Sequence, residues 1–139
     1  MTETMTILPH SLPACANARI VLFAMRRMGA NGLADARAAH VMFTAFGQGF
    51  RRPLVLMRAL MAELASSAAG TIAIAPCCCA RMTPAEAALI SIVAWVESAP
   101  DTARLLTADL LGVRRVENVL MAAGAVATAF ADEGRPVVG

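Results

Sequence analysis

Residues 83–96 read TPAEAALISIVAWV, and this stretch indicates the fold class more clearly than any other part of the 139-residue chain. Thr83 is suited to cap the first backbone N–H groups of a helix, Pro84 suits the first helical position, and Glu86 completes a capping box. Apolar residues follow at helical spacing and form the expected buried face, which consists of Ala85, Leu89, Ile92, Val93 and Val96, with Trp95 beside it. The stretch therefore predicts an amphipathic helix.

Helical spacing of apolar residues also occurs before and after this stretch. It predicts further helices over residues 11–31, 34–46, 53–67, 98–112 and 115–131. Ser11 is expected to cap the first of these, and Arg26 and Arg27 to lie in its last turn, where positive charge suits the helix dipole. Residues 70–76 alternate isoleucine with small residues and predict a short extended segment that leads into three successive cysteines.

These elements predict an all-α fold: a single-domain bundle of five to six helices with one short extended, cysteine-containing connection. No linker long enough to divide domains occurs, so we expect one domain over residues 1–139. Residues 1–10 and 134–139 are expected to be flexible ends.

The composition excludes several classes of protein. Hydrophobic residues make up 58% and charged residues 16% of the chain, which excludes intrinsic disorder as the main state. A net charge of +2 gives no electrostatic footprint for nucleic acid. The longest run without charged residues, Leu64 to Ala80, has 17 residues and contains serine, glycine and proline, so we expect no transmembrane span. Residues 1–13 lack the features of a secretory signal, which favours the cytoplasm.

Two stretches carry a resemblance to a known family. Residues 50–65, FRRPLVLMRALMAELA, and residues 74–89, IAPCCCARMTPAEAAL, resemble a small helical family from alphaproteobacteria to which no function is assigned. The resemblance covers most of the chain. It implies no activity and carries over no functional residues.

The cysteine triplet is the most unusual chemical feature of the sequence. In an extended segment, Cys77 and Cys79 would point to one side and Cys78 to the other. Such a pair suits a soft ion, Cu(I) or Zn(II), with a further ligand from Cys15, His40 or His10. The triplet also precedes a helix start, which favours thiol redox or sensing chemistry. The third interpretation is plain packing, because free cysteine is often buried.

Arg51 and Arg52 form a second candidate site. They precede the expected start of a helix, where anions bind. The alternative is that they are solvated, or that they pair with Glu63 and Glu86. The chain carries no P-loop, no nucleophile elbow and no di-iron helix motif, so no catalytic residues are proposed from sequence.

The sequence leads to two functional hypotheses. An apolar excess without any catalytic motif predicts a protein that associates with itself, as a homo-oligomer, or with a protein partner. The alternative is a thiol-based protein, either soft-metal-binding or redox-sensing, centred on the cysteine triplet.

Overall fold

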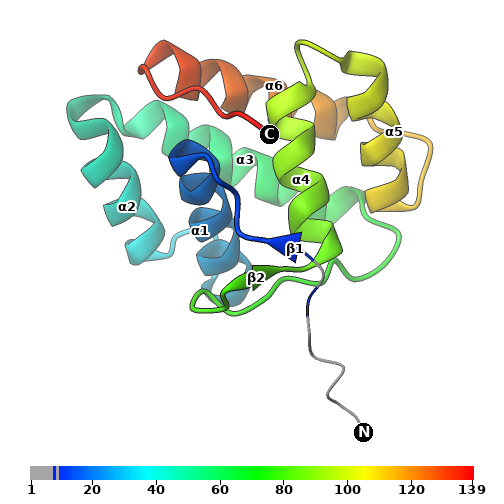
Figure 1. Ribbon diagram of the computed structural model, residues 1–139, viewed down its shortest axis with the longest axis horizontal. Coiled ribbons are helices and arrows are strands. Elements are labelled where there is room, and N and C mark those ends of the chain that lie inside the picture. Colours follow the sequence, from blue (N-terminus) through cyan, green and yellow to red (C-terminus); the bar gives the residue numbers. More distant parts are fainter. Residues whose placement is uncertain (1–7, 9) are drawn as a thin grey trace, which may run out of the picture.

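Six α-helices build the protein in the computed structural model, which describes residues 8 and 10–139 (Figure 1). Their bounds are α1 Ala16–Asn31, α2 Ala36–Phe46, α3 Arg51–Ser67, α4 Pro84–Trp95, α5 Pro100–Leu111 and α6 Glu117–Asp132, and a single 3-10 turn, η2 (Gly47–Gly49), joins α2 to α3. Two short strands, β1 (His10–Ser11) and β2 (Arg81–Met82), pair antiparallel with His10 opposite Met82. The all-α prediction is confirmed.

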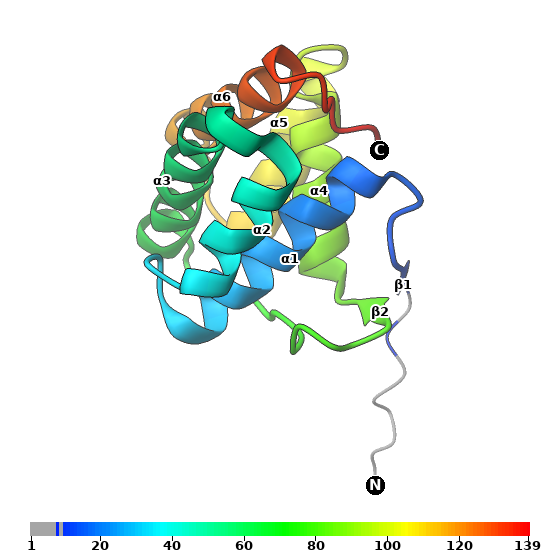
Figure 2. The ribbon, with the colours of Figure 1, turned by 90° about the vertical axis from the view of Figure 1, so that its left-hand side faces the viewer.

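The core lies between two groups of helices. α6 lies along α3, α5 packs against α4, and α1 runs between α2, α3 and α4 (Figure 2). Phe130 of α6 is fully buried and meets Phe46 edge-to-face, with ring centroids 4.9 Å apart. Three fully buried methionines, Met25, Met42 and Met57, fill the space between α1, α2 and α3. Because methionine is unbranched and adaptable, it suits a core assembled from helices that meet at several angles.

The start of α4 is formed as its sequence predicts. The Thr83 hydroxyl accepts a hydrogen bond from the Glu86 backbone N–H at 3.0 Å, and the Glu86 carboxylate accepts one from the Thr83 N–H at 2.9 Å. This reciprocal pair is a capping box, with Pro84 at the first helical position.

The start of α1 differs from its prediction. The helix begins at Ala16 rather than near Ser11, because Ser11 belongs to β1 and pairs with Arg81. The expectation that Arg26 and Arg27 lie in the last turn is also wrong, since α1 continues to Asn31. Arg26 is instead buried within the bundle.

The two ends of the chain differ in how far the structure describes them. Of the start expected to be flexible, only Leu8 and His10 lie within the described residues. The last residues fold back on the bundle: Asn17 Nδ2 donates to the Pro136 carbonyl at 2.9 Å, and Val137 is only 9% exposed. Pro136 and Val137 thus contact the bundle, while the flexibility expected of residues 134–139 stays a prediction.

The connection from α3 to α4 covers residues 68–83 and carries the cysteines. Residues 71–76 follow an irregular path and form no strand. The cysteines then make a tight turn, which the Cys79 N–H closes by donating to the Pro76 carbonyl at 3.0 Å. The extended cysteine segment expected from sequence is thus a turn. Among residues 8 and 10–139, no helix is both long and apolar enough to cross a membrane.

Candidate functional site

An ion pair between α1 and α4 lies at the centre of the candidate site. Arg26 Nε donates to Glu86 Oε2 at 2.8 Å, and Arg26 Nη2 donates to Glu86 Oε1 at 3.0 Å. The two side chains are only 2% and 0% exposed. A parallel, two-point pairing of this kind is the strongest geometry for an arginine and a carboxylate.

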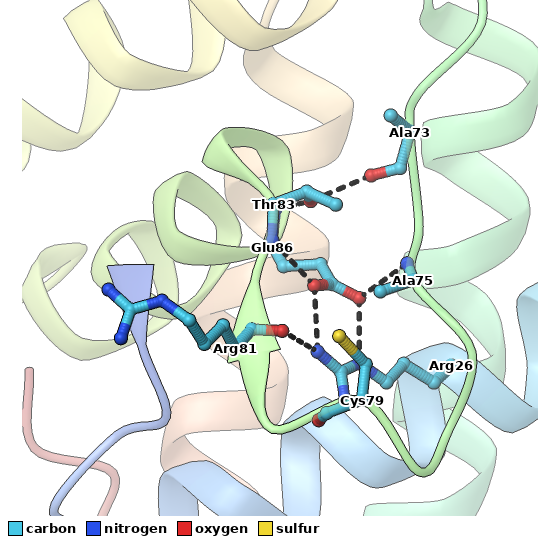
Figure 3. Close-up of polar contacts among 7 residues, drawn as sticks. All are labelled: Arg26, Ala73, Ala75, Cys79, Arg81, Thr83 and Glu86. Carbon is cyan, nitrogen blue, oxygen red and sulfur yellow. Dashed lines mark hydrogen bonds and ion pairs between the residues drawn. The ribbon is translucent and has the colours of Figure 1, made fainter. Parts of the chain in front are cut away.

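Both partners also bind the backbone of the connection that carries the cysteines (Figure 3). Arg26 Nη1 donates to the Cys79 carbonyl at 2.8 Å, and Nη2 donates to the Arg81 carbonyl at 2.7 Å. On the other side, Glu86 Oε2 accepts from the Ala75 N–H at 3.0 Å. The ion pair thus holds the connection before and after the cysteine turn.

Thr83 adds a third point of attachment. While its hydroxyl oxygen caps α4, its proton is donated to the Ala73 carbonyl at 2.8 Å. We call Arg26, Thr83 and Glu86 together the loop clamp. The hydrogen bonds of the loop clamp are buried or partly buried, so water competes weakly with them.

The charges of the loop clamp stabilise one another. Burial alone would raise the pKa of Glu86, but the hydrogen bonds from Arg26, Thr83 and Ala75 outweigh burial and hold this pKa below its ordinary value of 4.5. The hydrogen bond with Glu86 raises the pKa of Arg26, against the opposing effect of burial. Both groups are therefore charged at neutral pH.

Two residues of the cysteine turn line one surface pocket. Cys77 and Cys78 are exposed, and Cys79 is half-buried. Cys77 and Cys79 line a small pocket of about 130 Å³, whereas Cys78 is not among its lining residues. We call this hollow the thiol pocket; its other lining residues are Leu12, Arg19, Leu22, Phe23 and Arg26. The extended geometry on which the pairing of Cys77 and Cys79 was predicted is absent, and a shared site for the two thiols stays a prediction.

Three arginines of α1 lie around the cysteine turn. Arg19 and Arg26 line the thiol pocket. Arg27 forms a two-point ion pair with Asp35, at 2.9 and 3.1 Å. This pairing raises the pKa of Arg27, which burial opposes, and a side-chain interaction with Cys77 raises it further. Cys77 therefore lies near the ion pair of Arg27 and Asp35.

The further ligands expected for a metal do not join the triplet. Cys15 stands just before α1, where its thiol contacts the Pro136 carbonyl at 3.9 Å. Burial favours a higher pKa for Cys15, but polar backbone groups of Ala18, Val138 and Asn17 outweigh it, and the pKa is lowered. His40 is exposed on α2, and His10 is exposed in β1. Within the described part of the chain, no three His, Cys, Asp or Glu side chains are grouped to hold a metal ion.

Arg51 and Arg52 lie in the first turn of α3 rather than before it. Arg52 Nη1 pairs with Asp132 Oδ2 at 2.7 Å on the exposed surface, so the partner expected among Glu63 and Glu86 was wrong. Arg51 lies over the Phe50 ring, 5.8 Å from its centroid. An anion site at this pair stays a prediction, with Arg52 already bound to a carboxylate.

A larger cavity of about 350 Å³ opens beside the connection, between α1, α3 and α4. It is lined by apolar side chains, among them Met25, Met28, Met61, Leu64, Leu89 and Ile74. None of its lining residues is titratable, so this cavity offers packing contacts and no ionisable group.

Sequence reasoning missed the role of Arg26. A signal was present: Arg26 falls beside Met25 and one turn after Leu22, on the face of α1 that the apolar spacing marks as buried. An arginine on such a face needs a carboxylate partner. The partner was not identifiable, because Glu86 lies 60 residues away and is already explained locally by the capping box.

Comparison with known proteins places the chain in a family. No curated protein matches it, and no solved structure matches it. The model of one family, described as a family of unknown function (DUF6628), matches residues 2–127. The expected resemblance to a family without assigned function is thereby confirmed, while the alphaproteobacterial source stays a prediction. The match spans most of the 139 residues, and the chain belongs to the family of unknown function DUF6628.

Proposed function

We propose that the protein is a thiol-based redox protein that exchanges disulfides with small molecules at the thiol pocket. The observation that carries this proposal is the placement of Cys77 and Cys79 in one surface pocket with Arg19 and Arg26. Positive charge beside an accessible thiol is the environment of reactive cysteines.

The proposed chemistry is a two-step exchange with a low-molecular-weight disulfide. The Cys77 thiolate attacks one sulfur of the disulfide, a new sulfur–sulfur bond forms, and the other half leaves as a thiolate. Cys79 then attacks the sulfur of Cys77 and releases the second half of the reagent as a thiolate. In total, two protein thiols are oxidised to one disulfide, and one small disulfide is reduced to two thiols.

Cys77 is the attacking residue in this proposal and Cys79 the resolving one. Cys77 is exposed and interacts with Arg27, whereas Cys79 is half-buried and its carbonyl is bound by Arg26. A disulfide between residues this close in sequence is strained, and strained disulfides are the easily reduced ones used in regulation and catalysis. The loop clamp supports the proposal because it fixes the turn while leaving its thiols accessible.

The experiment that tests this function follows the mass of the protein during reaction with 2-hydroxyethyl disulfide, an uncharged reagent. A Cys15→Ser background removes the remote thiol. In that background we expect a transient adduct, followed by a species two hydrogens lighter than the reduced protein. Adding Cys79→Ser should stop the reaction at the adduct, and adding Cys77→Ser should abolish the fast reaction.

The matched control is Cys78→Ser, which alters the same turn but not the thiol pocket. It should react like the Cys15→Ser background. The proposal is contradicted if Cys78 carries the fast reaction, or if the folded protein reacts no faster than the same chain in denaturant. We further propose that the protein is located in the cytoplasm, where small thiols keep protein thiols reduced. Measuring whether its cysteines are reduced in cells tests this location.

Soft-metal binding by Cys77 and Cys79 stays the second hypothesis for the same sulfurs. Arg26 and Arg27 are paired with carboxylates, so the positive charge of Arg19 is the one that favours an anionic reagent over a cation. Copurified Cu(I) or Zn(II) that is lost in the Cys77→Ser, Cys79→Ser double variant would favour the metal instead. Measured under reducing conditions, the metal content separates the two hypotheses.

A further inference from the structure

We propose that Arg19 makes the thiol pocket selective for small disulfides that carry a carboxylate. This inference rests on the proposed function and adds the class of reagent to it. It follows from the partners of the three arginines around the cysteine turn, from the lining of the pocket and from its size.

Two of the three arginines are already neutralised by carboxylates. Arg26 binds Glu86, and its nitrogens also bind the carbonyls of Cys79 and Arg81. Arg27 binds both carboxylate oxygens of Asp35. Neither guanidinium has the charge or the free geometry to hold a second anion.

Arg19 is different. Its Nε donates to the Pro13 carbonyl at 2.6 Å, which orients the side chain, and among residues 8 and 10–139 no carboxylate pairs with it. Nη1 and Nη2 of Arg19 have no hydrogen-bond partner within this described part of the chain. Arg19, an exposed residue, therefore adds an uncompensated positive charge to the lining that it shares with Cys77 and Cys79.

The remaining walls of the thiol pocket suit a small organic molecule. Leu12, Leu22 and Phe23 give it an apolar lining, and its volume is about 130 Å³. A space of this volume holds a short carbon chain, and its lining includes both Cys77 and Arg19. Because a guanidinium pairs with a carboxylate through two parallel hydrogen bonds, a small acid-bearing thiol is the complementary class of ligand.

The test compares three disulfides that differ in charge. Dithiodiglycolate is anionic, 2-hydroxyethyl disulfide is uncharged and cystamine is cationic. Their rates of adduct formation are measured by mass spectrometry on a Cys15→Ser, Cys79→Ser variant, in which the reaction stops at the adduct of Cys77. Each rate is divided by the rate of the same reagent with the denatured chain, which removes differences in intrinsic reactivity.

We expect the anionic disulfide to react about two- to fivefold faster than the uncharged one after this correction, and the cationic one to react slowest, as for one exposed ion pair. Arg19→Gln should make the corrected rates of the three disulfides equal. Arg19→Lys should keep part of the difference among them, since a lysine keeps the charge without the two-point geometry. Arg115→Gln is the matched control, because it removes an equal charge from an exposed residue of another region. It should keep the full order.

The outcomes separate the inference from the function on which it rests. Corrected rates that are fast but equal for the three reagents would overturn the role of Arg19 and leave the thiol function standing. If all three reagents react with the folded protein no faster than with the denatured chain, the thiol function itself is overturned. A second check keeps Arg19 in place and raises the salt concentration. The differences among the corrected rates of the three disulfides should shrink as the charges are screened, and unchanged differences would contradict selection by charge.

Discussion

At the scale of single residues, the buried pair of Arg26 and Glu86 is the feature on which the candidate site depends. Taking two charges out of water costs several kcal/mol each, and only good geometry with further hydrogen bonds offsets that cost. Both conditions are met here, since the pair is two-pronged and the remaining donors and acceptors bind the backbone of the cysteine connection. The pair therefore links the stability of the bundle to the shape of the thiol pocket.

The first stability prediction concerns Glu86→Gln. Glutamine keeps the size of the side chain and still suits a capping box, but it leaves the buried charge of Arg26 without a counter-charge. We expect the free energy of unfolding to fall by about 3–5 kcal/mol at neutral pH, measured by denaturant titration. The control is Glu63→Gln, which should stay within about 0.5 kcal/mol because no ion pair of Glu63 is found in the described residues.

The same variant has a second readout in acid. Because the pKa of Glu86 is lower in the folded protein than its ordinary value of 4.5, its contribution to stability is complete above that value and is lost as pH falls through the folded pKa. The unfolding free energy of the wild type should decline below pH 4.5, and Glu86→Gln should decline less. Paired arginines also lower the pKa values of Asp35 and Glu117. These two groups account for the loss of unfolding free energy in acid that the Glu86→Gln variant still shows. Parallel curves for the two proteins would contradict the loop clamp.

At the scale of elements, helix starts were predictable where the signal is local. All the information for the start of α4 lies in Thr83, Pro84 and Glu86, and the structure has that start. The predicted start of α1 was wrong because Ser11, although it is a good capping residue, pairs with Arg81 in a short strand. No local sequence pattern indicates that strand. For the same reason, the thiol pocket was predictable only in part: the cysteines are visible in the sequence, but the arginines around them are placed by the fold.

The element-scale prediction is Thr83→Ala. The substitution removes the capping oxygen of α4 and also the proton donated to the Ala73 carbonyl, so the unfolding free energy should fall by about 0.5–2 kcal/mol, towards the upper part of that range. Denaturant titration measures it. Ser98→Ala is the control, because the residue before α5 is Ala99 and no side chain caps that helix. Equal losses in both variants would show that the effect is not a cap.

At the scale of the whole molecule, the core accounts for much of the apolar composition. Every helix contributes at least one large, fully buried side chain, from Met25 in α1 to Phe130 in α6. The exposed large hydrophobic residues are spread over several elements rather than gathered on one: Leu33, Phe43, Val55, Leu105, Met121 and Val138. Self-association, as a homo-oligomer or with a protein partner, thus stays a prediction, supported by composition and by the strong exposure of Leu105 and Met121.

Sedimentation measures that prediction directly. From the composition, we expect the protein to sediment as a dimer or larger at micromolar concentration. Leu105 and Met121 are 72% and 73% exposed, so Leu105→Ser or Met121→Ser should weaken an assembly whose contact includes that residue. The core is untouched by either change, so the helical content should stay the same. A monomer at every concentration would contradict self-association and leave two explanations for the apolar composition: a different protein as partner, or burial in the core alone.

The pairing of α3 with α6 has a consequence for synthesis on the ribosome. α3 makes its most extensive helix contact with α6, the last of the six helices to be translated. Until Phe130 has left the exit tunnel, Phe46 lacks its aromatic partner and the side of α3 that α6 covers is open to solvent. A nascent chain in that state exposes apolar surface, which is what chaperones bind. Cotranslational folding of this protein is therefore a late event, completed only when nearly all of the bundle has emerged.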